Sequence, residues 1–130
     1  MNAILTGQVF YSYQHELLER GSFADIGAHF SGIKPFHKHA GEIALSDDKL
    51  FISGDENLQI PLASIEQIYL GFDEAFPRTL VKNFGALWQP LRLSLSDGNK
   101  LYLIVDYNML GANNQLWFDR LRELLSEWGN

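Results

Sequence analysis

The last third of the chain places two strand-like segments directly before one amphipathic helix, and this order constrains the fold most. Residues 90–96 alternate apolar and polar side chains, residues 97–99 (Asp-Gly-Asn) are a turn sequence, and residues 100–106 run back as a second strand. From Asn113 or Asn114, either of which could cap a first helical turn, the spacing predicts a helix to residue 129. Its apolar stripe comprises Trp117, Leu121, Leu124, Leu125 and Trp128. Because such a stripe faces a core, we expect the helix to cover an open end or face of a β-sheet.

The middle of the chain predicts further strands. Residues 41–46 and 49–54 alternate on either side of the tight turn Asp47-Asp48, which indicates a hairpin. Residues 58–62 resume the alternation, and Pro61 restricts this strand to a sheet edge or a strand end. Residues 65–72 predict another strand.

The N-terminal third is patterned differently. Val9, Phe10, Tyr13, Leu17 and Leu18 recur at helical spacing, so we predict a short helix over residues 8–20, ended by Gly21. Residues 22–33 predict a partly extended segment with ambiguous spacing. Residues 73–89 are the longest weakly patterned stretch, and predict either a long functional loop or one shortened by a strand over residues 79–82.

Composition favours one folded domain. The chain has 130 residues, 46% of them hydrophobic, which is enough for one core. It has no cysteine, so a disulfide framework, a thiolate metal site and a cysteine nucleophile are excluded. The net charge of −6 disfavours nucleic-acid binding and contact with anionic membrane surfaces, although a local basic patch could override it. No segment is typical of a signal peptide or a membrane helix, and we expect a cytoplasmic protein.

Three motifs resemble the pleckstrin-homology (PH)-like fold of the bacterial PH and GRAM-like group. Residues 41–52 (GEIALSDDKLFI) are similar to the hairpin of that family, and residues 60–68 (IPLASIEQI) are similar to its strand join. The C-terminal helix carries Trp117, where PH domains typically place a tryptophan. The resemblance implies a mainly β barrel of seven strands in two roughly orthogonal antiparallel sheets, capped by the C-terminal helix. We therefore expect a single domain over residues 1–130, with an N-terminal helical extension over 1–21, the barrel over 22–112 and the capping helix over 113–129.

Phosphoinositide-binding members of this family carry basic residues between their first two strands, and the resemblance places residues 34–40 there. This most basic short segment supplies the candidate ligand-binding residues Lys34, His37, Lys38 and His39. It lacks arginine and so cannot bind phosphate in a bidentate manner. Arg78, Lys82 and Arg92 could contribute only if the fold brings them near. A solvated loop, an anion contact, and a metal-binding pair of His37 and His39 on one strand face all stay open.

The sequence carries no recognisable catalytic set. Its serines do not lie in a Gly-x-Ser-x-Gly motif, and there is no glycine-rich phosphate loop. The pairs at residues 47–48 and 55–56 are typical of turns, and the isolated carboxylates Glu66 and Asp106 are weak candidates for acid–base chemistry. The aromatic residues Phe76, Phe84 and Trp88 either anchor a partner at the surface or pack their loop against the core.

These observations predict a non-catalytic binding module that recognises a protein segment or a small polar ligand, through loops or by strand addition at a sheet edge. One alternative is an anion or phospholipid-headgroup site in residues 34–39, tuned by histidine protonation. Another is a small barrel enzyme with a pocket. No metal or cofactor is predicted. A homodimer formed through an edge strand or residues 76–88 stays open, and the sequence does not identify the protein partner or small anionic ligand.

Overall fold

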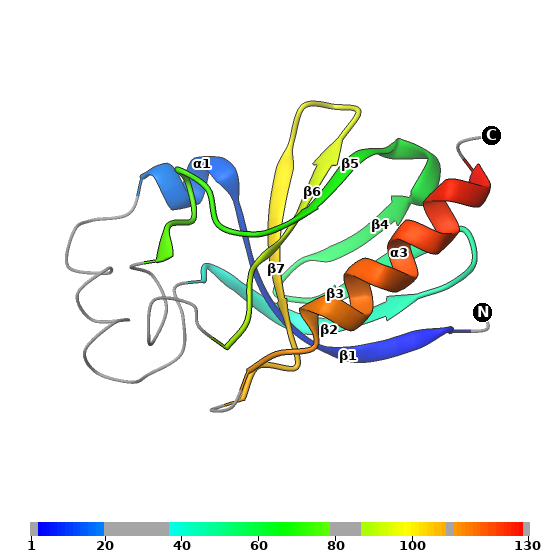
Figure 1. The fold of residues 1–130 in the computed structure, drawn as a ribbon, viewed down its shortest axis with the longest axis horizontal. Helices are drawn as coiled ribbons and strands as arrows, with labels where there is room; N and C mark the ends of the chain where they lie inside the picture. Colours follow the sequence, from blue (N-terminus) through cyan, green and yellow to red (C-terminus); the bar gives the residue numbers. More distant parts are fainter. Residues whose placement is uncertain (1–2, 20–36, 79–86, 109–110, 129–130) are drawn as a thin grey trace.

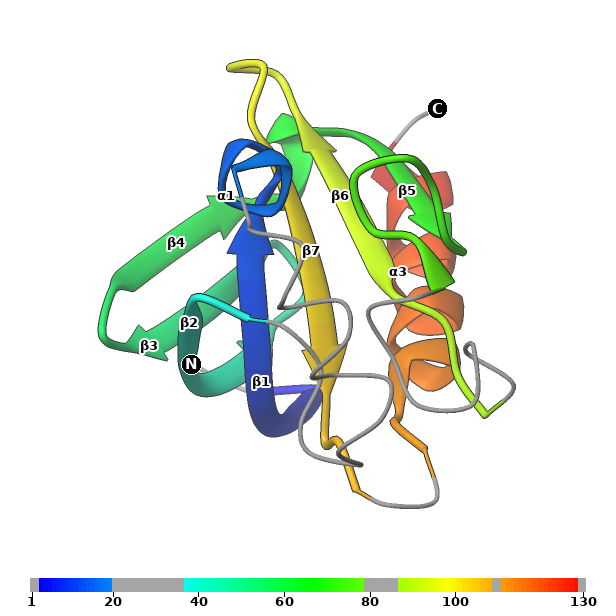
Figure 2. The same cartoon turned by 90° about the vertical axis from the view of Figure 1, so that its left-hand side faces the viewer.

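The computed structural model of the protein describes residues 3–19, 37–78, 87–108 and 111–128. Its elements in chain order are β1 (Leu5–Tyr13), α1 (Gln14–Leu18), β2 (His39–Leu45), β3 (Lys49–Gly54), β4 (Asn57–Pro61), the 3-10 helix η1 (Leu62–Ser64), β5 (Ile65–Leu70), β6 (Leu91–Leu95), β7 (Lys100–Val105) and α3 (Asn114–Trp128). The described strands form one antiparallel sheet of seven strands in the order β4-β3-β2-β1-β7-β6-β5. The sheet curls into a half-barrel, and α3 packs against its β5, β6 and β7 side (Figures 1 and 2).

The mainly β class, the strands from residue 41 onward and the C-terminal helix are confirmed. The hairpin β2–β3 turns at Asp47-Asp48, where the Ser46 hydroxyl donates to the Asp48 carboxylate and accepts from the backbone N–H of Lys49. Pro61 ends β4, which lies at one edge of the sheet, as expected for a residue without an N–H.

The helix predicted over residues 8–20 is wrong for most of its length. Residues 5–13 form β1, which pairs with β2 on one side and with β7 on the other, so this segment is the centre of the sheet and not an extension of it. Only Gln14–Leu18 is helical. Val9 and Tyr11 point into one core while Phe10 packs into another, so apolar side chains on both faces produced a false helical spacing.

Two hydrophobic cores lie on the two faces of the sheet. The inner core collects inward side chains from all the strands and is closed by Trp117, Leu121 and Leu124 of α3. The outer core comprises Leu17, Ala75, Phe76, Tyr102 and Ile104, with Phe10, Phe72, Trp88, Tyr107 and Ala112 partly buried against them. Strand β7 is therefore covered on both faces.

The outer core distinguishes between the two alternatives for Phe76. This side chain is 1% exposed and stacks on Tyr102 with ring centroids 5.9 Å apart, so it packs its loop against β7 and does not form a surface anchor. Trp88 is partly buried and lies edge-on to Phe76 at 6.4 Å. Phe84 and the strand expected over residues 79–82 lie outside the described residues.

Asn114 joins the sheet to α3. The β6–β7 ladder pairs Leu91 with Leu103, and Gln89 and Val105, the next residues that could exchange backbone hydrogen bonds, lie beyond its end. The side chain of Asn114 continues it instead, accepting from the Val105 N–H at 2.8 Å and donating to the carbonyls of Leu103 at 3.0 Å and Gln89 at 2.7 Å. Asn114 is thus committed to the strand ends, and the capping role we predicted for its side chain is wrong.

Candidate functional site

The two histidines of the basic segment do not meet in one site. His37 stacks on Phe10 with ring centroids 4.1 Å apart, whereas His39 stacks on Tyr11 at 4.8 Å. Phe10 packs into the outer core and Tyr11 into the inner core, so the two imidazoles lie against opposite faces of β1. The structure therefore does not bring them together as a metal-binding pair. Lys34 and Lys82 lie outside the described residues.

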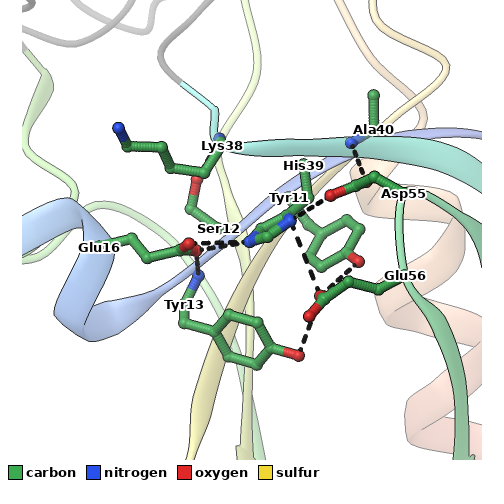
Figure 3. Close-up of polar contacts among 9 residues, drawn as sticks. All are labelled: Tyr11, Ser12, Tyr13, Glu16, Lys38, His39, Ala40, Asp55 and Glu56. Carbon is green, nitrogen blue, oxygen red and sulfur yellow. Dashed lines mark hydrogen bonds and ion pairs between the residues drawn. The ribbon is translucent and has the colours of Figure 1, made fainter.

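His39 is the centre of a network of carboxylates at the start of β2 (Figure 3). Its Nε2 lies 2.8 and 3.0 Å from the carboxylate oxygens of Glu16 on α1. Its Nδ1 lies 2.5 Å from Asp55 and 3.7 Å from Glu56, both in the turn between β3 and β4. One imidazole thus connects three elements that are far apart in the sequence.

Two tyrosines of β1 complete this His39 network. The hydroxyls of Tyr11 and Tyr13 both donate to Glu56 Oε1, at 2.8 and 3.2 Å. Burial, followed by the neighbouring Glu56 carboxylate, raises the pKa of both phenols, that of Tyr13 to about 12. The tyrosines therefore stay neutral donors at physiological pH, and the backbone N–H of Tyr13 donates to Glu16 at 2.8 Å.

The electrostatics of the network favour a protonated His39. Burial alone disfavours the imidazolium, but hydrogen bonds to Asp55 and Glu16 and the charge of Glu56 outweigh it, so the pKa of His39 is raised. The same bond to His39 lowers the pKa of Asp55. Only the imidazolium can donate from both ring nitrogens at once, and both face carboxylates here.

The remaining described basic candidates lie apart from this imidazole. The Lys38 ammonium points away from His39, while its backbone N–H donates to the Ser12 hydroxyl at 3.0 Å (Figure 3). The Arg78 guanidinium lies over the Phe72 ring, 4.8 Å from its centroid. Arg92, on β6, bonds to Asp73 at 2.9 Å.

Asp73 holds a second polar network that we did not predict. It accepts from the Tyr102 hydroxyl at 2.7 Å and from Arg92 at 2.9 Å, while its other oxygen accepts from the Phe76 backbone N–H at 2.9 Å. Burial opposes ionisation of this carboxyl, but these hydrogen bonds outweigh it and lower its pKa. The network fixes the loop after β5 over the outer core, and we assign it a structural role.

The edge strand β5 and α3 enclose a seam, the β5–α3 seam, with a hollow at each end. One hollow, of about 500 Å³, lies between Ile65, Gln67 and Ile68 of β5 and Arg122, Leu125 and Ser126 of α3. The other, of about 280 Å³, is lined by Leu70, Leu87, Trp88 and residues at the start of α3. Leu87 and Leu116 beside it are about half exposed, at 51% and 52%. The seam thus offers apolar surface next to a strand edge.

Comparison with models of known protein families and with curated proteins found no match to this chain. Within the described residues, no group of three or more His, Asp or Glu side chains is arranged to hold a metal ion. Neither of the described helices, α1 and α3, is both long and apolar enough to cross a membrane.

Proposed function

We propose that the protein is a non-catalytic, PH-like binding module that takes an extended protein segment as an additional strand along β5, in the β5–α3 seam. The observation that carries this proposal is the juxtaposition of a strand edge with a partly apolar hollow beside it. Backbone pairing along such an edge supplies affinity, and hollows for alternate side chains supply specificity.

The strand order and the C-terminal helix support the PH-like assignment. Seven antiparallel strands followed by a helix that carries Trp117 into the inner core agree with what the sequence motifs imply. Of the basic segment, His37 and Lys38 directly precede β2 and His39 and Ala40 begin it, so its described part lies next to the connection in which the resemblance places it.

Backbone geometry supports β5 as the docking edge. Within the described residues β5 pairs with β6 alone, and the Gly71 N–H donates to the Pro90 carbonyl at 3.0 Å. Because hydrogen-bonded and non-bonded pairs alternate along antiparallel strands, the backbone groups of Ile68 and Leu70 point away from β6. The other edge strand, β4, is less suited because it ends at Pro61, which cannot donate.

A steric block in the seam tests this function. Peptides from a random library displayed on phage would be selected against the protein, and their binding measured for Ser126→Trp and for the control Arg120→Trp. Ser126 lines the larger hollow, whereas Arg120 lies six residues earlier, about 120° around the helix axis, on the exposed side of α3. We expect Ser126→Trp to weaken binding at least ~10-fold and Arg120→Trp to leave it unchanged. Selected peptides that bind both variants equally, or a selection without enrichment, would contradict the proposal.

The alternative function, anion or headgroup binding by residues 34–39, has less support. His39 would have to contact an anion while its two ring nitrogens face Glu16 and Asp55, with Glu56 also within 4 Å. A phosphate bound at His39 would place further negative charge beside these carboxylates, and negative charges held close together repel one another.

A further inference from the structure

A trough of about 620 Å³ crosses β1, β2, β3 and β4 on the described surface. The strand register explains its shape, because two rows of outward side chains form its walls. One wall row is Gln8, Glu42, Ser53 and Asn57. The other is Thr6, Ala44, Phe51 and Gln59.

The floor between the walls is backbone. The row that separates them includes Ile43 and Ile52, whose side chains are 1% and 2% exposed because they point into the inner core. Asp106 stands at the β1 end of the trough, where its carboxylate accepts from the Gln8 N–H at 2.9 Å and from the Asn113 amide at 2.9 Å. A side chain at Gly7 would meet this carboxylate at 2.8 Å. Gly7 therefore lets the carboxylate occupy this position.

The walls carry hydrogen-bonding groups that no residue in the described part of the chain engages. Among the described residues, no side-chain hydrogen bond links any of these polar wall residues to another residue: Thr6, Gln8, Glu42, Ser53, Asn57 and Gln59. Neighbouring strands lie about 4.8 Å apart, so each wall presents one side chain at nearly that spacing across four strands. Phe51 is partly exposed in the middle of one wall and adds an aromatic face.

We propose that this trough binds a short, linear, neutral oligosaccharide. Amides, hydroxyls and a carboxylate bind vicinal hydroxyl groups, and an aromatic face packs against the C–H groups of a sugar ring. The spacing of the wall side chains is close to the length of one hexose unit. No lysine or arginine lines the trough, while Glu42 and Asp106 do, so a phosphorylated or carboxylated ligand is repelled.

This proposal is independent of the β5–α3 seam. Strands β2, β3 and β4 lie on one side of β1, and α3 lies on the other (Figure 2). A ligand in the trough therefore leaves β5 accessible, and either proposal can fail without the other.

The test is an NMR titration of the labelled protein with linear tetrasaccharides derived from cellulose, starch, chitin and mannan, each to ~10 mM, which covers weak binding. We expect at least one to cause saturable amide shifts confined to the trough. Asn57→Ala and Phe51→Ala should each weaken that binding ~5-fold or more, whereas Gln115→Ala on α3 should not. Asn57 is exposed at the sheet edge, so its variant remains informative if Phe51→Ala fails to fold.

Three results would overturn the proposal. The first is the absence of saturable shifts with all four sugars. The second is a set of shifts that maps outside the trough or is unchanged in Asn57→Ala. The third is a response to spermidine but to none of the sugars, which would make the trough a cation site defined by Glu42 and Asp106.

Discussion

Replacing Asn114 by alanine is expected to destabilise the protein far more than the same change at the adjacent Asn113. Asn114 is 1% exposed and bonds three backbone groups at the ends of β6 and β7. Its loss leaves the Val105 N–H without this partner, which costs about 1–3 kcal/mol, and removes two further hydrogen bonds worth about 1 kcal/mol each. The sum is about 3–5 kcal/mol, a large share of the ~5–15 kcal/mol typical of a domain.

Urea unfolding measures this loss, with the slope m checked for constancy. Asn113 is exposed and its side chain makes one hydrogen bond, to Asp106, so Asn113→Ala should cost no more than ~1 kcal/mol. Hydrogen exchange at the Val105 amide should also accelerate in Asn114→Ala beyond the change in global stability. A loss below about 1 kcal/mol at unchanged m, or equal losses for the two variants, would refute the ladder role assigned to Asn114.

Three further predictions concern the His39 network, the contact between Gly7 and the Asp106 carboxylate, and the outer core. Because the pKa of His39 is raised on folding, its stabilising contribution is full below its unfolded pKa of about 6.5 and is lost as pH rises through the folded pKa. The free energy of unfolding measured in urea should therefore fall over this pH range in the wild type and change less with pH in His39→Gln. Gly7→Ala should cost ~1–3 kcal/mol by displacing the Asp106 carboxylate, and the double variant Gly7→Ala/Asp106→Ala should cost less than the sum of the single changes. Phe76→Ala should lower the free energy of unfolding by ~3–5 kcal/mol, whereas an effect under 1 kcal/mol would indicate a surface position.

The sequence predicted β2 and β3, whose two faces differ, and missed β1, whose faces are both apolar. Strand β7 is also covered on both faces, but the turn sequence at residues 97–99 revealed it. Strands β2 and β3 alternate because their outward sides meet solvent, as the exposed Glu42 and Ser53 illustrate. Along β1, Phe10 and Tyr11 are consecutive and enter two different cores, so the period of two is hidden. Only pairing with β2 and β7, which local spacing does not reveal, identifies this segment as a strand.

The His39 network likewise depends on contacts between distant segments, which local sequence patterns do not reveal. The basic segment drew attention to His39, but its partners Glu16, Asp55 and Glu56 come from α1 and a distant turn. The pair Asp55-Glu56 is indeed in a turn, yet turn chemistry alone does not predict that both face an imidazole. The usable signal was the alternation of Tyr11 and Tyr13, since each phenol on a covered strand face usually finds a hydrogen-bond partner, and here both bond to Glu56.

The double burial of β7 limits where the described surface can bind a ligand. Leu103 and Val105 face the inner core, while Tyr102 and Ile104 face the outer core, so neither face of this strand is accessible. The accessible parts of the sheet include the outward face of β2, β3 and β4 and the edge of β5, which lie at opposite ends of the strand order. The trough on the first surface has no lysine or arginine among its lining residues, and the second surface presents backbone groups beside apolar hollows. Their different chemistry suits a hydroxyl-rich ligand at one surface and an extended polypeptide at the other.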